Sequence, residues 1–377
     1  MTQLRSYDAI VVGLGAMGSA TLYHLARRGV RAVGLDQFSP GHTFGSSHGD
    51  SRIIRETYFE HPLYVPLVQR AHHLWRELEE NTGKSLMKIT GGLMIGPPDG
   101  MVVAGTLRSV REHGLPHEVL EADELRKRFP AFRLPDGAAA VLDPRAGYLD
   151  PEACTRSHLS AAVGAGAETR FNEPVVDWCA DGEDVRVTTA AGEYIADRMV
   201  LCAGPWTQKL ANLPALMLTV ERQSVFWFDP PEFPGYEPDG FPIYAYEFKS
   251  GTICYGFPAL SRGMKASVMH DGQTVNDADH VDRQVGAAEV APLRDALRPI
   301  LPSLADSAVH ETTVCLFTNT VDHDFVIDWH PLHPNVLISS PCSGHGFKFA
   351  SAIGELQADL IVDGKTGFDL SPFAIAR

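Results

Sequence analysis

The chain has 377 residues, and its 47 Asp plus Glu exceed its 32 Lys plus Arg, which gives a formal net charge of −15. This charge opposes unspecific binding to nucleic acid or to an anionic membrane surface, so we expect neither partner. The 44% hydrophobic and 21% charged residues are ordinary for a globular protein, and the length favours two domains. The chain has no run of about 20 apolar residues, so we expect no membrane span. Asp8 and His24 interrupt the apolar N-terminal stretch, so we do not expect a signal peptide.

The cysteines indicate a reducing environment. None forms a CxxC pair, and none stands at zinc-site spacing from a histidine pair, so we expect no metal. A core of this size does not need disulfides, which favours free thiols and a cytoplasmic protein. The six are Cys154, Cys179, Cys202, Cys254, Cys315 and Cys342.

The first 36 residues predict a nucleotide-binding βαβ unit. A short apolar run over 9–12 is typical of a strand buried on both faces, and 31–35 predicts the next strand. Between them, the segment GLGAMG precedes a predicted helix over 19–28, with Gly29 placed as its C-terminal cap. Asp36 ends the second strand. This order of strand, glycine loop, helix and acid is the context that makes the GxGxxG pattern informative.

Each residue of that fingerprint has a physical role. Gly13 allows the tight turn, Gly15 lets the backbone approach a pyrophosphate, and Gly18 lets helix and strand pack closely. The helix N-terminus favours the negative charge of the diphosphate. Asp36 can accept hydrogen bonds from a ribose hydroxyl. The fingerprint alone does not separate FAD from NAD.

The rest of the chain predicts a discontinuous nucleotide domain. Helical spacing covers 65–81 and 151–163, a hairpin pairs 185–189 with 193–196, and buried strands follow at 199–202 and 336–339. Residues 221–269 alternate aromatic with polar and turn residues, which indicates an antiparallel sheet. A glycine loop leads into a last helix from about 347 to 364. We therefore expect an α/β chain with a Rossmann-type domain and a second α+β domain on a mostly antiparallel sheet. The predicted ranges are 1–84, 147–218 and 318–377 for the first domain, and 85–146 and 219–317 for the second.

Five segments, in order, resemble one family. They are GSSHGDSRIIRETY, CAGPW, YGFP, VCLFTNTVDHDFVID and SGHGFKFA. Together they are similar to the monomeric sarcosine oxidase and N-methyltryptophan oxidase family, flavoproteins of the D-amino-acid-oxidase-like fold. The resemblance covers about 7–373. It implies FAD, oxidation of a secondary amine to an imine, reoxidation by O2 to give hydrogen peroxide, and a monomer.

The resemblance also implies roles for particular residues. Cys315 alone would be read as a small buried hydrophobe, but the resemblance makes it the attachment point of FAD through an 8α thioether. Arg55 and Lys348 would bind the substrate carboxylate, because a guanidinium offers that group a bidentate fork. Lys265 would promote the reaction with O2. The other implied residues are Arg52 and His48 beside the flavin, His345 in the final glycine loop, Tyr246 and Tyr255 around the substrate, and Gly204, Gly344 and Gly346 where the backbone approaches the cofactor.

Several points stay open at this level. Arg52 and Arg55 would share a face if their segment were helical. Some family members have a histidine where this chain has Met269, and His270 is its neighbour. The resemblance implies an N-methyl amino acid, sarcosine-like or N-methyltryptophan-like, as the substrate, and pipecolate or a glycated (fructosyl) amino acid is the alternative. An NAD(P)-dependent dehydrogenase and a non-enzymatic flavin-binding protein are the remaining alternatives.

Overall fold

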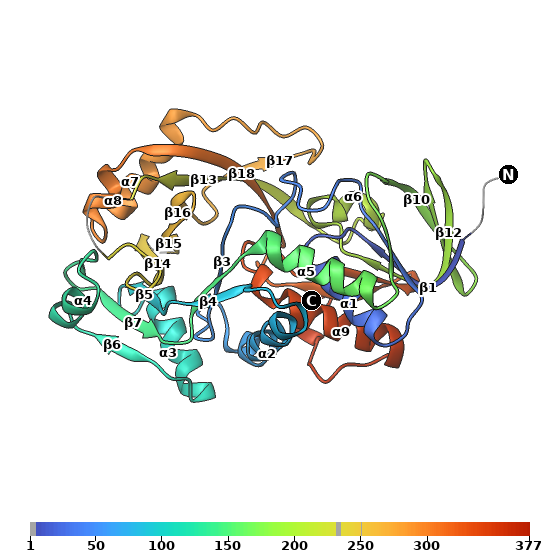
Figure 1. Cartoon of the computed structure of the whole chain (residues 1–377), viewed down its shortest axis with the longest axis horizontal. Coiled ribbons are helices and arrows are strands. Elements are labelled where there is room, and N and C mark those ends of the chain that lie inside the picture. The colour runs from blue at the N-terminus through green and yellow to red at the C-terminus, as the bar shows by residue number, and fades with distance from the viewer. Residues whose placement is uncertain (1–4, 231–234, 250) are drawn as a thin grey trace.

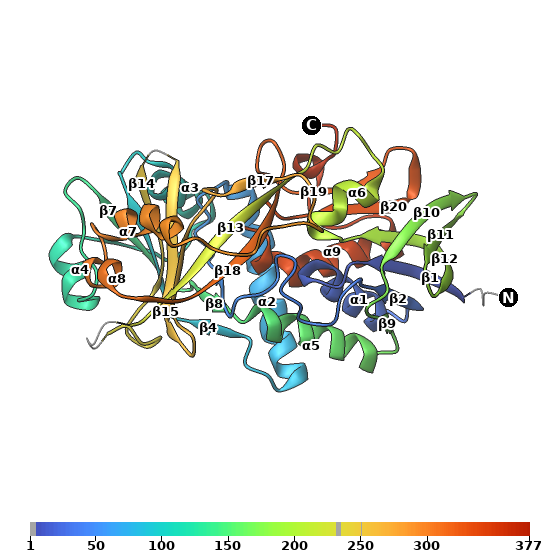
Figure 2. The same ribbon diagram turned by 90° about the horizontal axis from the view of Figure 1, so that it is seen from above.

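The computed structural model describes residues 5–230, 235–249 and 251–377. Two large sheets lie side by side, with a small sheet between them (Figures 1 and 2). The half with β1 and β12 contains both ends of the described chain, and the other half contains β5, β7 and β14. The long strands β13 and β18 run from the second half toward the first. The fold is mixed α/β, as predicted.

The first sheet has the order β10-β11-β12-β1-β2-β9, with β20 paired to β12 and β19 paired to β20. Its pairs β12–β1, β1–β2, β2–β9 and β12–β20 are parallel. The strands are β1 (Arg5–Val12), β2 (Ala32–Leu35), β9 (Glu168–Arg170), β10 (Val175–Asp181), β11 (Asp184–Thr189), β12 (Gly192–Leu201), β19 (Val326–His330) and β20 (His333–Ser340).

Strand β1 shows why this sheet is apolar on both faces. Ala9 and Val11 pack into one hydrophobic cluster, and Ile10 and Val12 pack into another on the opposite face. The first cluster is shared with the helices α1 (Ala16–Arg27), α2 (Val65–Thr82), α5 (Pro151–Gly164) and α9 (Ala350–Asp363). The short helix α6 (Thr207–Ala211) contributes to the second.

Most predicted elements of this half are present, with two corrections. Helix α1 begins at Ala16, three residues before the predicted start, directly behind the glycine loop. The predicted strands 193–196 and 199–202 are one strand, β12, because its first half pairs with β11 and its second half with β20. The polar residues Asp197 and Arg198 between the two halves looked like a break in the sequence pattern.

The second sheet has the order β17-β13-β16-β15-β14-β5-β7-β6, and β18 pairs with β13. The predicted antiparallel pairing is confirmed for β13 to β16, but β14 pairs in parallel with β5. The strands are β5 (Gly92–Gly96), β6 (Glu118–Leu120), β7 (Ala139–Asp143), β13 (Thr219–Phe228), β14 (Ile243–Lys249), β15 (Thr252–Leu260), β16 (Gly263–Val268), β17 (Gln273–Val275) and β18 (Val309–Asn319). The accompanying helices are α3 (Met101–His113), α4 (Ala122–Arg128), α7 (Ala291–Leu297) and α8 (Pro302–Asp306).

The small sheet joins β3 (Arg52–Ile54), β8 (Gly147–Leu149) and β4 (Met87–Ile89), with β8 antiparallel to both neighbours. The helical turn considered for Arg52 and Arg55 is therefore wrong, because this segment gains its backbone partners from β8. Strand β4 also crosses the domain boundary predicted at residue 147 by pairing with β8. The domain ranges themselves stay a prediction.

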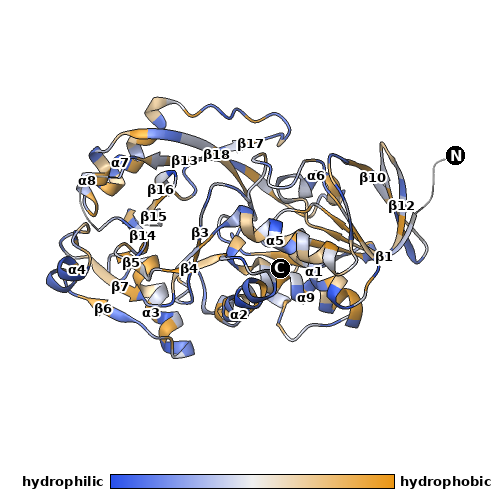
Figure 3. Ribbon diagram, viewed as in Figure 1, coloured by the Kyte–Doolittle hydropathy of each residue, from blue (hydrophilic) through white to orange (hydrophobic). Residues whose placement is uncertain are grey.

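Hydrophobic residues concentrate on the strands of both large sheets, whereas α4 is largely hydrophilic (Figure 3). Across the described residues, no helix combines the length and apolarity needed to cross a bilayer. The same residues contain no group of three or more His, Cys, Asp or Glu that could hold a metal ion. All six cysteines are free thiols.

Two buried histidines in the helix layer predict sensitivity to acid. The side chains of His24 and His158 are 6% and 1% exposed, and the ring of Tyr23 packs on both. Burial, and then the nearby Arg27, lower the pKa of His24 to about 3, and burial lowers the pKa of His158 well below its usual value. The folded state therefore keeps both rings neutral, while the unfolded chain takes up protons below about pH 6.5.

We expect the free energy of unfolding to be independent of these two groups above about pH 7. Below about pH 6 it should fall by roughly 1.4 kcal/mol per pH unit for each histidine. Urea unfolding between pH 7 and 5 measures this slope. The ring centres of Trp75 and His158 lie 5.0 Å apart, so His158→Phe keeps a ring packed against Trp75. This variant should lower the slope of the unfolding free energy with pH by the contribution of one histidine. An unchanged slope in that variant would contradict the assignment.

Candidate active site

The glycine loop forms a tight turn at the carboxyl end of β1. Gly13 has φ of 88°, and a Cβ there would lie 2.5 Å from the carbonyl oxygen of Cys202. A Cβ on Gly18 would lie 1.8 Å from the Gly13 carbonyl oxygen, so α1 packs on the turn only without a side chain. Gly15 is the N-cap of α1 and makes no side-chain cap, so the helix N-terminus keeps N–H groups that suit an anion.

Asp36 lies beside this loop at the end of β2. Its carboxylate accepts hydrogen bonds from the backbone N–H groups of Leu14 at 2.7 Å and Phe38 at 2.8 Å. Burial raises the pKa of Asp36, and these two hydrogen bonds oppose the rise. The residue fixes the loop and keeps lone pairs for a ribose hydroxyl.

A cavity of about 410 Å³ extends from this loop to the second sheet. It brings together most residues that the sequence analysis selected. They are Gly13, Gly15, Asp36, His48, Arg52, Arg55, Gly204, Tyr255, Lys265, Cys315, Gly344, His345, Gly346 and Lys348. Gly18 does not line it, in keeping with its place between helix and strand.

Cys315 faces this cavity from β18. Along the strand, Val314 packs in a separate apolar cluster with Val220, whereas Cys315 and Phe317 lie on the opposite side with Trp227. The Cys315 Sγ is 3.5 Å from Nη2 of Arg52 and donates to the carbonyl oxygen of Ser46 at 3.7 Å. The sulfur therefore lies in the cavity wall beside a guanidinium.

The neighbouring basic groups differ in charge state. Burial, followed by Arg52, lowers the pKa of His48 to about 3, so this imidazole is neutral at pH 7. Lys265 donates from Nζ to the carbonyl oxygens of Gly49, at 2.7 Å, and Ser51. Burial and then Arg52 lower the pKa of Lys265 well below its usual value. A guanidinium stays protonated, so Arg52 carries the permanent positive charge of this group. Lys265 needs a negative charge close to it in order to be cationic.

Arg55 and Glu60 form an ion pair at the other end of the cavity. Nη2 of Arg55 donates to both Glu60 oxygens, at 2.7 and 2.5 Å. The guanidinium also lies 3.9 Å from the ring centre of Phe59 and 4.2 Å from that of Tyr58. Burial acts to raise the pKa of Glu60, but the charge of Arg55, the charge of Lys348 and the hydrogen bond from Arg55 outweigh it, so the pKa lies below its usual value. A carboxylate already occupies the guanidinium.

Lys348 lies beside this pair. Its Nζ donates to the carbonyl oxygen of His345 at 2.6 Å and is 5.1 Å from the ring centre of Tyr58. Burial, and then the charge of Arg55, lower the pKa of Lys348 to about 7, although Glu60 opposes the shift. Its charge therefore depends on whether an anion is bound nearby.

His345 is held from both sides. Its Nε2 is 3.0 Å from the carbonyl oxygen of His323, and its Nδ1 is 2.5 Å from the hydroxyl of Tyr58. A carbonyl can only accept, so Nε2 carries the proton and Nδ1 accepts from Tyr58. Burial lowers the pKa of His345 to about 4, so the ring is neutral.

The two tyrosines selected from the sequence lie on opposite faces of their sheet. Tyr255 lines the cavity together with Ala245, its partner in the β14–β15 register. Tyr246, the next residue along β14, points to the opposite face and packs in the core with Cys254. Tyr246 is therefore a core residue and not a cavity residue.

Met269 and its neighbour His270 point in different directions. Met269 lines the cavity, whereas His270, with φ of 54°, turns away and places Nδ1 3.1 Å from Oε2 of Glu221. His270 does not take the place of Met269.

Glu60 and Tyr58 were not predicted as site residues. Glu60 lies two residues beyond the segment GSSHGDSRIIRETY, and its place five residues after Arg55 was the available signal. Tyr58 is the last residue of that segment, but nothing in the sequence indicates its contact with His345.

Comparison with known proteins identifies the chain. Residues 8–360 match the family model described as FAD dependent oxidoreductase. The chain belongs to this family. It is 41% identical over 373 residues to the monomeric sarcosine oxidase of Streptomyces avermitilis, covering 98% of this chain and 97% of the relative. It is 35% identical to N-methyl-L-tryptophan oxidase of Escherichia coli, covering 98% and 99%. The resemblance seen in the sequence is confirmed, and the match to FAD enzymes counts against the NAD(P) alternative.

Solved structures agree with this fold. The open form of NikD, an unusual amino acid oxidase essential for nikkomycin biosynthesis, superimposes with a TM-score of 0.82 at 25% identity, covering 98% of this chain and 97% of that one. L-proline dehydrogenase from P. horikoshii superimposes with a TM-score of 0.85 at 21% identity, covering 100% and 98%. The protein is an FAD-dependent oxidoreductase.

The residues that line the cavity fit FAD independently of the similarity to known proteins. Three buried polar atoms of cavity-lining residues have no hydrogen-bond partner in the described chain: Nε2 of His48, Oγ of Ser51 and Oγ1 of Thr318. Buried polar atoms are rarely left unpaired, so a polar ligand is expected beside them. The glycine turn, Asp36 and the N-terminus of α1, where among the described residues only the Ala16 N–H donates to a side chain, that of Ser47, meet the needs of the dinucleotide part.

Proposed function

We propose that the protein oxidises a secondary amine that carries a carboxylate, with O2 as the electron acceptor and hydrogen peroxide as a product. FAD, when bound, supplies the acceptor for the hydride equivalent lost from the carbon next to nitrogen. The observation that supports a carboxylate substrate is the Arg55–Glu60 pair beside Lys348, which opens into the same cavity as the dinucleotide loop. The guanidinium binds a carboxylate within the protein, so a substrate carboxylate can take the same donors where it replaces Glu60.

The chain's own residues divide the work. Arg55 and Lys348 would hold the substrate carboxylate once Glu60 withdraws, which orients the amine. Lys265 and Arg52 would stabilise negative charge that develops near the cofactor. Cys315 would tether FAD as an 8α thioether, with Arg52 and His48 beside the attachment point.

His345, which the resemblance placed among the catalytic residues, has both ring nitrogens engaged by protein groups. We assign it a positioning role, because no free nitrogen is left to exchange a proton with substrate.

The substrate class follows from the relatives and from the cavity wall. The relatives are named for sarcosine and N-methyl-L-tryptophan. Beside Arg55 the wall is apolar, with Ile53, Phe59, Phe257 and Met269. We therefore place N-methyl amino acids first. Pipecolate and fructosyl amino acids are the second candidates, and a fructosamine oxidase from Aspergillus fumigatus shares the fold at a TM-score of 0.80. We further propose a cytoplasmic monomer.

A peroxide-coupled screen of secondary amines tests the function. Sarcosine, N-methyl-L-tryptophan, pipecolate and a fructosyl amino acid should be compared with the matching amines that lack the carboxylate. We expect peroxide with at least one acid and at least a hundredfold lower kcat/KM with its decarboxylated partner. Equal rates for both would reject carboxylate recognition, and no peroxide with any amine would reject the function.

Lys348 predicts how carboxylate binding depends on pH. Because its pKa is lowered to about 7, the lysine loses its charge above that pH in the free site, and binding an anion then requires proton uptake. The affinity for a carboxylate without an amine, such as acetate, should be constant below about pH 6.5 and fall up to tenfold per pH unit above about pH 7.5. Perturbation of the flavin absorbance spectrum measures it. Lys348→Met should bind more weakly and lose this pH dependence; a variant that still titrates would contradict the assignment.

A further inference from the structure

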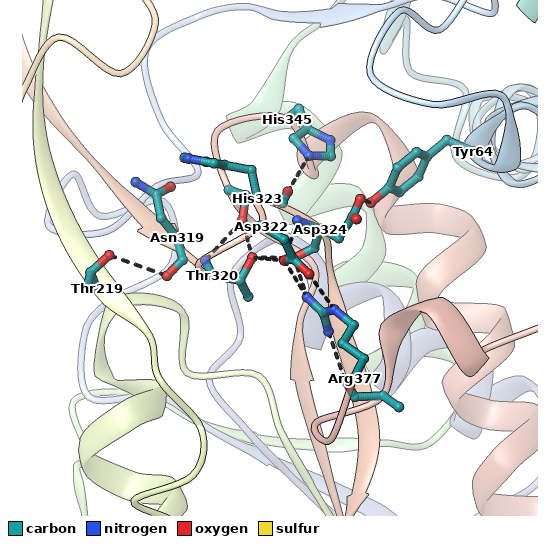
Figure 4. A network of polar contacts seen from close by, with 11 residues as sticks. Tyr64, Thr219, Asn319, Thr320, Asp322, His323, Asp324, His345 and Arg377 are labelled. Carbon is teal, nitrogen blue, oxygen red and sulfur yellow. Dashed lines mark hydrogen bonds and ion pairs between the residues drawn. The ribbon is translucent and has the colours of Figure 1, made fainter.

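The loop between β18 and β19 is tied to the active site through His345. It runs from Thr320 to Asp324, and its His323 carbonyl oxygen accepts the proton of His345 Nε2 at 3.0 Å. The next residue, Phe325, stacks on the His345 ring with centres 4.9 Å apart. Figure 4 shows the loop passing directly beneath this ring.

The loop makes a second, indirect contact with His345. Oδ1 of Asp324 accepts from the hydroxyl of Tyr64 at 2.6 Å, and the Tyr64 ring meets the His345 ring edge-on at 5.4 Å. The orientation of His345 therefore depends on where the loop lies. The orientation matters for substrate, because the His345 carbonyl oxygen accepts from Lys348 Nζ at 2.6 Å.

Arg377 holds the loop from the other side. Its Nε and Nη2 donate to the two carboxylate oxygens of Asp322, each at 2.7 Å, and Nη2 lies 3.4 Å from the Asp324 carbonyl oxygen. Figure 4 shows the guanidinium facing Asp322 below the loop. A planar two-point contact of this kind fixes geometry as well as charge.

Asp322 also forms hydrogen bonds with other residues of the loop. Its Oδ1 accepts from the Thr320 hydroxyl at 3.0 Å and from the Asp324 backbone N–H at 3.1 Å. The single proton of the Thr320 hydroxyl is shared between this carboxylate and the Asp324 carbonyl oxygen, which lies 2.7 Å from Oγ1. The hydrogen bond from Arg377 is the main cause that keeps the pKa of Asp322 below its usual value.

We propose that Arg377 is a positioning residue of the active site. Its bidentate pair with Asp322 holds the 320–324 loop against His345, and His345 in turn holds the ammonium of Lys348 where the substrate carboxylate binds. Arg377 lies outside the residues that line the cavity. The inference rests on the proposed function, since it gives Lys348 the role assumed there.

The test compares Arg377→Ala, Arg377→Lys and Asp322→Asn in the flavin-loaded enzyme. We expect Arg377→Ala to weaken acetate binding and to raise KM by about fivefold, with a smaller change in kcat, as a partly exposed bidentate pair warrants. Arg377→Lys should recover part of the loss, because it keeps the charge without the fork. Combining Arg377→Ala with Asp322→Asn should add little to either single change.

A matched control is Arg298→Ala, which removes an exposed ion pair with Asp306 at 2.8 Å between α7 and α8. It should leave KM and acetate affinity unchanged. Acetate affinity and KM within twofold of wild type in both Arg377→Ala and Asp322→Asn would overturn the inference, as would an equal effect in Arg298→Ala. If Arg377→Ala does not fold, Asp322→Asn decides alone. Failure of the proposed function would show differently, as a wild-type enzyme that oxidises no secondary amine, and acetate binding would still compare the variants.

Discussion

Arg55→Gln should lower kcat/KM for the carboxylate substrate by roughly a thousandfold, or about 4 kcal/mol. Arg55 is 3% exposed, and its guanidinium lies close to the rings of Tyr58 and Phe59. An amide there offers neither the charge nor the two-pronged fork, so the substrate carboxylate would be desolvated without its partner. Steady-state kinetics with the best amine from the screen, together with acetate affinity, measure the loss.

Two variants make this expectation specific. Arg145→Gln removes another arginine of the same region, one that pairs with Glu56 at 3.2 Å outside the cavity lining, and should change kcat/KM less than twofold. Glu60→Gln should act in the opposite direction to Arg55→Gln. It removes the carboxylate that competes for the guanidinium, so acetate should bind about tenfold more tightly. Weaker acetate binding in Glu60→Gln would mean that Glu60 orients Arg55 and does not compete with substrate.

The tether proposed at Cys315 predicts that Cys315→Ala releases its FAD on denaturation, whereas the wild-type protein keeps it. After acid precipitation, the wild-type pellet should be yellow, and the variant should leave the colour in the supernatant. The fold should be retained, because β18 keeps its backbone pairing with β13 and loses only a small side chain. Mass spectrometry of the denatured chains measures the attached cofactor directly.

Cys342→Ala is the matched control, since Cys342 also lines the cavity and is a free thiol. Burial raises the pKa of Cys342 to about 11, which disfavours its thiolate. This variant should remain fully flavinylated. FAD released from the wild-type protein on denaturation would reject the covalent attachment. Loss of attachment in Cys342→Ala would show that Cys342, and not Cys315, carries the FAD.

Local patterns predicted those parts of the fold whose backbone partners are near in sequence. The helices over 65–81 and 151–163 match α2 and α5 within one residue, because caps and apolar spacing are written into the segment itself. Strand β3 escaped prediction because its three residues gain their partners from β8, almost a hundred residues later. The continuity of β12 was missed for the same reason, since β20 completes it from near the end of the chain.

The candidate site divides in a similar way. Gly13, Gly15 and Asp36 could be selected from the glycine fingerprint and its strand and helix context. Arg55, Cys315 and Lys348 could be selected because they lie in contiguous motifs that resemble a family. Tyr246 was misplaced because the face of a strand is decided by register, and one residue along β14 separates cavity from core. Glu60, Tyr58, His323 and Arg377 were not selected, since each matters only through a partner brought to it by folding.

By itself, the sequence determined the dinucleotide turn, the alternation of helices and strands, and the family, because glycine geometry and apolar periodicity act over a few residues. Only the tertiary structure decided which charges meet. Arg55 meets Glu60, Arg52 meets the sulfur of Cys315, and Arg377 meets Asp322 across 55 residues. Burial then set the protonation of His48, His345 and Lys348, because the loss of water around a charged group depends on the whole packed molecule and not on its neighbours in the chain.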